Sequence, residues 1–217
     1  MLFQLKFVSK SFFLPAQSID CWAGSIPSAD RLSDIVLLEE QNILNNTQPH
    51  DNEADPTWLT ARLWQYNFLD LDYPEIQELK EFICQQYVDY STKLGYVPGK
   101  TYIQCWANII RDNQRCITPH EHACAHAQAP GEYSHVSGNL CLQADNTRTY
   151  YKNPVLPDMA APIDNIPGEM ILFPSYIVHW TDQNTSKTPR ISIAFDIITE
   201  EVYNMIDNHN FRVLNPG

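Results

Sequence analysis

The second half of the chain is a succession of short segments rich in β-branched and aromatic residues, and this pattern constrains the fold most. Pro, Gly, Asn and Asp residues separate the segments. No helical stretch connects them in the way that parallel strands require, which excludes a parallel α/β sheet. The pattern therefore predicts a mainly β body, either a sandwich or a barrel. The expected strands are residues 101–111, 133–143, 147–153, 169–175, 176–181 and 190–198.

Two helices are predicted in the first hundred residues. Residues 29–45 carry apolar residues at helical spacing, with an Asp near the start. Residues 73–95 form the stronger pattern, because Pro74 suits a first turn and Gly95 suits a C-terminal stop. The expected apolar faces are Leu32, Ile35, Leu37, Leu38 and Ile43 in the first helix, and Ile76, Leu79, Phe82, Ile83 and Tyr87 in the second.

These patterns divide the chain into two parts. Residues 1–99 are expected to supply a strand at residues 2–8 and the two helices, all packing on the core. Residues 100–217 are expected to form the β body, with a short C-terminal helix at about residues 199–207.

Charge and hydropathy exclude several classes of function. The formal net charge is −12 and no cluster of Lys and Arg is present, which argues against binding to nucleic acid. No apolar run approaches the roughly 20 residues of a membrane helix. Lys6 and Lys10 interrupt the apolar N-terminus, so we do not expect a signal peptide. The six cysteines form no CxxC pair, and we expect reduced thiols in a cytoplasmic protein.

Three histidines are the candidates for a metal site. His120 and His122 are one residue apart, so in a strand they would share a face while Glu121 points away. His179 follows much later, at the end of an apolar run. Imidazole suits Fe, Zn, Cu and Ni, and three protein ligands leave positions open for substrate. The His-x-His pair alone does not distinguish a metal site from two surface histidines.

The sequence around His179 carries further motifs. The stretch FPSYIVH ends at His179, and the stretch RIS begins at Arg190 on the next expected strand. A Ser-Gly pair lies on the strand after the first two histidines. These motifs resemble those of the 2-oxoglutarate- and Fe(II)-dependent oxygenases, above all a group from marine bacteria and tailed phages. The matching residues are His120, His122, Ser137, Gly138, Phe173, Pro174, Ser175, His179, Arg190 and Ser192.

This resemblance covers about residues 101–198 and implies a double-stranded β-helix, which is a jelly-roll or cupin-like fold. It implies that the three histidines bind Fe(II), and that Arg190 and Ser192 bind the far carboxylate of 2-oxoglutarate. The implied activity is that of a dioxygenase. It would use dioxygen to hydroxylate an unknown substrate, a small molecule or a protein, while 2-oxoglutarate becomes succinate and CO2. If the chain is phage-encoded, its expected location is the host cytoplasm.

The chain also departs from the family pattern. Better-known members carry Asp or Glu where this chain has His122, and a neutral ligand leaves more positive charge on the metal. Asp182, close after His179, is a candidate for orienting an imidazole from outside the ligand set. Tyr102 or Tyr150 is a candidate hydroxyl donor to 2-oxoglutarate.

The segment of residues 123–135 is longer than the link expected in this family. We predict that it forms a substrate lid containing His126, with His135 at its end. Two other functions stay open. One is a cupin-like three-histidine metalloenzyme that does not use 2-oxoglutarate, and the other is a non-catalytic phage-type β-sandwich that binds a partner. Arg190 discriminates between the 2-oxoglutarate-dependent oxygenase and the cupin-like enzyme, because without a dicarboxylate it would only form a salt bridge at the rim. Substrate and oligomeric state are not predicted.

Overall fold

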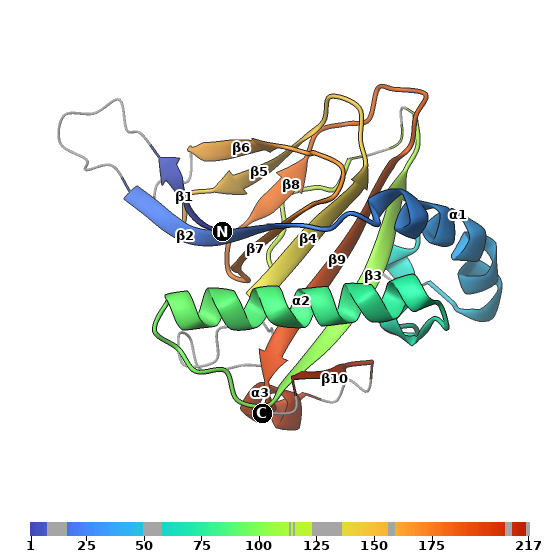
Figure 1. The fold of residues 1–217 in the computed structure, drawn as a ribbon. Coiled ribbons are helices and arrows are strands. Elements are labelled where there is room, and N and C mark those ends of the chain that lie inside the picture. The colour runs from blue at the N-terminus through green and yellow to red at the C-terminus, as the bar shows by residue number, and fades with distance from the viewer. Residues whose placement is uncertain are drawn as a thin grey trace.

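The computed structural model describes residues 1–7, 17–49, 58–112, 114, 116–122, 136–155, 159–206 and 210–215. In this part of the chain the fold is mainly β, as predicted (Figure 1). The strands are β1 (Leu2–Phe7), β2 (Gln17–Ser25), β3 (Thr101–Ile110), β4 (Val136–Gln143), β5 (Arg148–Lys152), β6 (Ala160–Asp164), β7 (Glu169–Pro174), β8 (His179–Thr181), β9 (Arg190–Thr199) and β10 (Arg212–Asn215). The helices are α1 (Ala29–Asn46), α2 (Pro74–Lys93) and α3 (Glu200–Met205), with short 3₁₀ turns η1 (Thr60–Arg62) and η2 (Phe68–Asp70).

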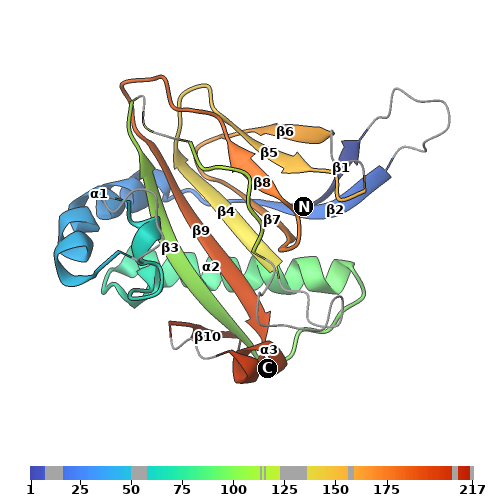
Figure 2. The same ribbon diagram turned by 180° about the vertical axis from the view of Figure 1, so that it is seen from behind.

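The strands form two antiparallel sheets. The larger has the order β1-β2-β7-β4-β9-β3-β10, and the smaller has the order β6-β5-β8. Helices α1 and α2 cover one face of the larger sheet, and the smaller sheet lies toward its other face (Figures 1 and 2). This arrangement is a jelly roll, so the predicted double-stranded β-helix is confirmed.

Alternation along β9 gives the two faces of the larger sheet different characters. Ile191, Ile193 and Phe195 are fully buried in the core beneath the helices. Because successive side chains of a strand point to opposite faces, Arg190 and Asp196 face the other way, toward the smaller sheet. β9, an interior strand of the larger sheet, therefore carries polar side chains into the space between the two sheets.

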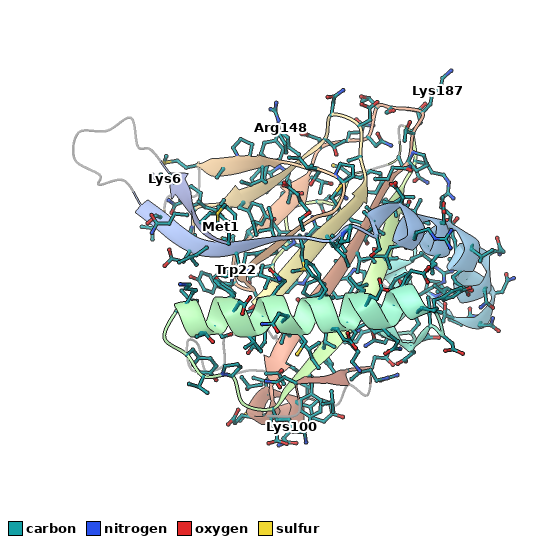
Figure 3. The ribbon with its side chains drawn as sticks, viewed as in Figure 1. Met1, Lys6, Trp22, Lys100, Arg148 and Lys187 are labelled. Atoms are coloured by element: carbon teal, nitrogen blue, oxygen red, sulfur yellow. The ribbon has the colours of Figure 1, made fainter. Side chains whose placement is uncertain are left out.

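The N-terminal strand is confirmed as β1, and β2 was not predicted. β2 pairs with β1 on one side and with β7 on the other, so the N-terminal region extends the larger sheet as well as covering it. The indole of Trp22 on β2 donates a hydrogen bond of 2.7 Å to Gln86 of α2 (Figure 3). The division of the chain at residue 99 stays a prediction.

The two long helices begin and end close to their predicted limits. α2 buries the predicted face, and Gly95 beyond its end has φ of 81°, as a helix-terminating glycine does. The predicted apolar face of α1 needs correction, because Leu37 and Leu38 are 41% and 68% exposed. At 3.6 residues per turn they lie off the stripe, and Val36 is buried instead.

The expected strand at residues 176–181 is also shorter than predicted. Residues 175–177 form a turn, closed by a hydrogen bond of 3.0 Å from Ile177 N–H to Pro174 O, and β8 begins only at His179. Among the described helices, none has the length and apolar character needed to cross a membrane. The five described cysteines form no disulfide.

Candidate metal centre

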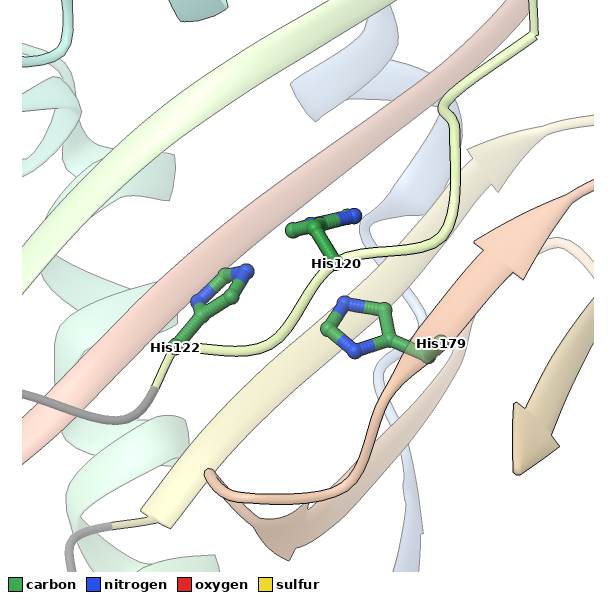
Figure 4. Close-up of side chains that lie close together, drawn as sticks. All are labelled: His120, His122 and His179. Atoms are coloured by element: carbon green, nitrogen blue, oxygen red, sulfur yellow. The ribbon is translucent and has the colours of Figure 1, made fainter. Parts of the chain in front are cut away.

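Three imidazoles meet between the two sheets. One ligand atom from each of His120, His122 and His179 lies within 4.8 Å of the others (Figure 4). The ring centroids of His120 and His179 are 4.4 Å apart, and each lies 5.0 Å from that of His122. The structure thus brings together the three histidines that the sequence singled out.

Backbone pairing positions these side chains. His120 and His179 form an isolated antiparallel bridge, and the N–H of His122 donates to Ser175 O at 3.0 Å. His120 forms only this isolated bridge and lies in no regular strand. Both imidazoles nevertheless converge on His179, while Glu121 is exposed.

Each imidazole uses its Nδ1 atom for a contact away from the centre. An oxygen that only accepts hydrogen bonds requires the nitrogen facing it to be the donor, so Nε2 keeps its lone pair for a metal. The Nδ1 contacts are His120 to Thr118 O at 2.7 Å, His179 to Ile177 O at 3.0 Å and His122 to Asp196 Oδ1 at 2.7 Å.

The carboxylate that orients an imidazole is Asp196, which the sequence interpretation missed. Asp182, the predicted candidate, instead accepts a hydrogen bond of 2.9 Å from the backbone N–H of Arg148. The signal for Asp196 was its spacing: it lies six residues after Arg190 in the same strand, and therefore on the same face.

Burial and charge set the protonation of the three rings. Burial, aided by the two neighbouring imidazoles, lowers the pKa of His179 to about 3. Burial and the neighbouring His122 also lower the pKa of His120. Burial acts in the same direction on His122, but the charge and the hydrogen bond of Asp196 raise the pKa of His122 above its ordinary value. His120 and His179 are thus held in the neutral state that ligates metals.

Arg190 is a buried cation without an anionic partner. Its side chain is 1% exposed, and Nη1 lies 3.4 Å from Ser192 Oγ. In the described part of the chain, Nε has no hydrogen-bond partner and no Asp or Glu forms an ion pair with this guanidinium. Burial lowers the pKa of Arg190. A buried, unpaired charge is costly, so this position is prepared for an anion and is not a salt bridge at the rim.

Two buried hydroxyl groups belong to the smaller sheet. Tyr151 on β5 and Thr181 on β8 have hydroxyl oxygens with no hydrogen-bond partner in the described residues. The Tyr151 ring stacks on His179 with centroids 6.1 Å apart, and its hydroxyl is close enough to Arg190 to affect the pKa of that guanidinium. Tyr151 is therefore near both His179 and Arg190.

The two tyrosines proposed from the sequence lie elsewhere. Tyr102 pairs with Ile198 at the opposite end of the β3–β9 ladder from Arg190, and its ring stacks on Tyr203 at 3.8 Å. Tyr150 lies on the opposite face of β5 from Tyr151, and its ring stacks on that of Trp180 with centroids 5.4 Å apart. Tyr102 therefore lies far from Arg190 along the β3–β9 ladder, whereas Tyr151 lies near it.

The comparisons with known proteins agree with this geometry. Residues 104–196 match the model of a family described as "Putative 2OG-Fe(II) oxygenase". This part of the chain therefore carries the sequence pattern of a 2OG-Fe(II) oxygenase domain. The family model accordingly indicates an oxidoreductase that uses Fe(II) and 2-oxoglutarate, and the cluster of three histidines fits the iron site of such an enzyme.

Solved structures share the fold of the oxygenase domain at low sequence identity. The carbocyclase SnoK from nogalamycin biosynthesis, described as non-heme and alpha-ketoglutarate dependent, is 11% identical with a TM-score of 0.57, covering 88% of each chain. A Pseudomonas putida prolyl-4-hydroxylase is 10% identical with a TM-score of 0.56, covering 83% of this chain and 88% of that chain. The epimerase SnoN, solved in complex with Fe3+, alpha-ketoglutarate and nogalamycin RO, is 10% identical with a TM-score of 0.57, covering 90% and 93%. No curated protein sequence matched.

The Ser-Gly pair of the oxygenase domain has a physical explanation. Ser137 is paired with Asp196 across β4 and β9, and its hydroxyl donates to Asp196 Oδ1 at 2.6 Å. Gly138 is paired with Phe195, and a Cβ on Gly138 would lie 2.1 Å from Phe195 Cζ. Both residues therefore accommodate side chains of β9: Ser137 binds Asp196, and Gly138 leaves space for the Phe195 ring.

One wall of the site in the oxygenase domain comes from β3. The Trp106 ring lies 5.6 Å from the His122 ring. Asn108 accepts a hydrogen bond from Thr60, and Gln104 donates one of 2.6 Å to Leu63 O. The chain around η1 therefore closes over this wall. The predicted lid, residues 123–135 with His126 and His135, lies outside the described residues.

Proposed function

We propose that this protein is an Fe(II)- and 2-oxoglutarate-dependent dioxygenase that hydroxylates its substrate at an iron held by His120, His122 and His179. The observation that carries this proposal is Arg190, a fully buried guanidinium that forms no ion pair with an Asp or Glu of the described residues, in a protein that also gathers three imidazoles. A dicarboxylate that binds the metal at one end and Arg190 at the other explains both features.

The chain's own residues divide the work of binding. The three Nε2 atoms offer neutral nitrogen ligands that suit Fe(II) and leave three of its six positions open. Arg190 would pair with the far carboxylate of 2-oxoglutarate, with Ser192 beside it. The hydroxyls of Tyr151 and Thr181 are further candidate donors, since burial leaves them in need of an acceptor.

When bound, Fe(II) supplies the redox chemistry that couples the two halves of the reaction. 2-Oxoglutarate, dioxygen and a C–H bond of the substrate give succinate, CO2 and a C–OH group, so one oxygen atom enters each organic product. The apolar walls around Tyr151 and Phe173 exclude water from this space. The substrate class stays open, and a cytoplasmic location stays a prediction.

Arg190→Lys tests the cofactor site, because lysine keeps the charge but loses the planar fork that matches a carboxylate. We expect the apparent 2-oxoglutarate requirement for succinate formation by the Fe(II)-loaded protein to rise about tenfold or more, with metal affinity little changed. Arg148→Lys is the matched control, because Arg148 is half-exposed and pairs with Asp164. A variant that loses metal and keeps its 2-oxoglutarate response would refute this role of Arg190.

A further inference from the structure

Among the described residues, the three proposed ligands carry no negative charge, and the structure offers a carboxylate nearby. We propose that Asp196 is a positioning residue that acts through His122: it orients this imidazole and supplies the negative charge that a carboxylate ligand would otherwise bring to the metal. This inference rests on the proposed function, because it assumes that the three histidines hold a divalent cation.

Asp196 is held firmly by the sheet. It lies on β9, between Ser137 of β4 and Gln104 of β3, with both of which it is in register. Its Oδ1 atom accepts from His122 Nδ1 at 2.7 Å and from Ser137 Oγ at 2.6 Å. The side chains of Asp196 and His122 are only 15% and 11% exposed. Because β9 is an interior strand and the contact is shielded from solvent, the Asp196 carboxylate has little freedom to turn away from the imidazole.

His122 differs from the other two histidines in what holds its ring. His120 and His179 contact backbone carbonyls two residues before themselves, and a carbonyl carries no net charge. His122 alone contacts a side chain, from a strand far along the sequence. A carboxylate on the outer nitrogen of a ligating histidine fixes its orientation and raises its basicity.

The same geometry makes a second carboxylate at position 122 unfavourable. A carboxylate placed there would lie near Asp196, and two like charges at this distance repel each other. Asp196 also has no imidazole to orient in such a variant, so neutralising Asp196 should weaken metal binding less there than in the wild type. A purely structural role of Asp196 would weaken binding equally in both backgrounds.

Co(II) binding, measured by titration calorimetry, tests this inference without requiring turnover. Asp196→Asn should weaken Co(II) binding about 10- to 100-fold. Asp182→Asn is the matched control, since that carboxylate contacts Arg148 and not an imidazole, and its affinity should equal that of the wild type. In a His122→Asp background, adding Asp196→Asn should weaken Co(II) binding less than it does in the wild type. This second comparison does not depend on the folding of Asp196→Asn alone.

The outcomes separate the two proposals. If His179→Ala binds Co(II) as the wild type does, the metal site of the proposed function is wrong. If His179→Ala loses binding while Asp196→Asn keeps full affinity, only the role of Asp196 is refuted. An equal loss from Asp196→Asn in both backgrounds would also refute the action through His122, because the effect would then not require the imidazole.

Discussion

His120 and His179 donate their backbone N–H groups to each other's carbonyl oxygens, at 3.1 and 2.9 Å. This single bridge joins the segment before residue 123 to the start of β8, and it sets the two imidazoles 4.4 Å apart. A metal ion bound by both rings would join the same two segments again through their side chains. Metal binding should therefore stabilise the folded state where the two segments are joined by only one backbone bridge.

The first prediction concerns this coupling of metal and stability. A ligand at about 100 times its Kd stabilises the folded state by about 2.7 kcal/mol, provided that it does not bind the unfolded chain. We expect Mn(II) to raise the unfolding temperature of the wild type relative to protein in EDTA. His179→Ala should abolish this rise, whereas Glu121→Gln, at an exposed neighbouring side chain, should retain it. An equal rise in His179→Ala would place the metal elsewhere.

The second prediction concerns the stability cost of Arg190. A buried guanidinium without a partner destabilises the ligand-free protein, and replacing such a charge with an apolar side chain of similar length is often stabilising, by about 1–4 kcal/mol. Arg190→Met should therefore raise the unfolding temperature of the ligand-free protein. The same variant should lose the further rise that 2-oxoglutarate gives to the metal-loaded wild type. A less stable Arg190→Met protein would mean that the charge is already compensated.

The third prediction is a pH dependence of the metal-free protein. The pKa of His179 is about 3 in the folded protein, below its ordinary value of 6.5. Below the ordinary value, the unfolded chain binds a proton that the folded chain does not, so stability falls with falling pH. From neutral pH to about pH 5, this contribution amounts to about 2 kcal/mol. His179→Gln lacks it and should lose correspondingly less stability over this range in denaturant titrations with EDTA. Identical losses in both proteins would contradict the assignment.

Alternation predicted the strands at the centre of the sheets, and it missed those whose sequence carries little pattern. β3, β4, β5, β7 and β9 all lie in the predicted segments. β6 contains Pro162, which is tolerated because β6 is at the edge of its sheet. β10 is a short edge strand, and β2 exists because β1 and β7 pair with it on either side. Tertiary pairing, and not local preference, creates these strands.

The site shows the same limit. Spacing within one strand placed Arg190 and Ser192 on a common face, and motif resemblance brought His179 to the first two histidines. Neither source contained information on which strands lie opposite each other. The sequence named Asp182 and Tyr102, whereas the structure places Asp196 against His122 and Tyr102 at the opposite end of the β3–β9 ladder from Arg190. Both relationships depend on the pairing of strands distant in sequence.

The fourth prediction concerns the packing of Gly138 against Phe195 on the core face of β9. A Cβ at Gly138 would lie 2.1 Å from the Phe195 ring, which is fully buried. Gly138→Ala should therefore displace this ring and destabilise the protein by about 1–3 kcal/mol. Gly99→Ala is the control, because a Cβ there meets no atom within 4 Å. Denaturant unfolding measures both, and Phe195→Leu in the Gly138→Ala background should recover part of the loss. Equal stabilities of the two glycine variants would show that the ring moves freely.

The fifth prediction separates Tyr151 from the tyrosines named by the sequence. The Tyr151 hydroxyl is buried without a hydrogen-bond partner in the described residues, and it lies near Arg190. If it donates to bound 2-oxoglutarate, Tyr151→Phe should weaken 2-oxoglutarate binding by about 1–2 kcal/mol, or roughly 5- to 30-fold, because a hydrogen bond to a charged group is lost. The ligand-free protein should become no less stable, because the hydroxyl satisfies no other group. Tyr150→Phe and Tyr102→Phe should bind 2-oxoglutarate as the wild type does, since both rings stack outside the site. Calorimetric titration of the Mn(II)-loaded proteins measures all four affinities, and a loss confined to Tyr102→Phe would restore the sequence-based assignment.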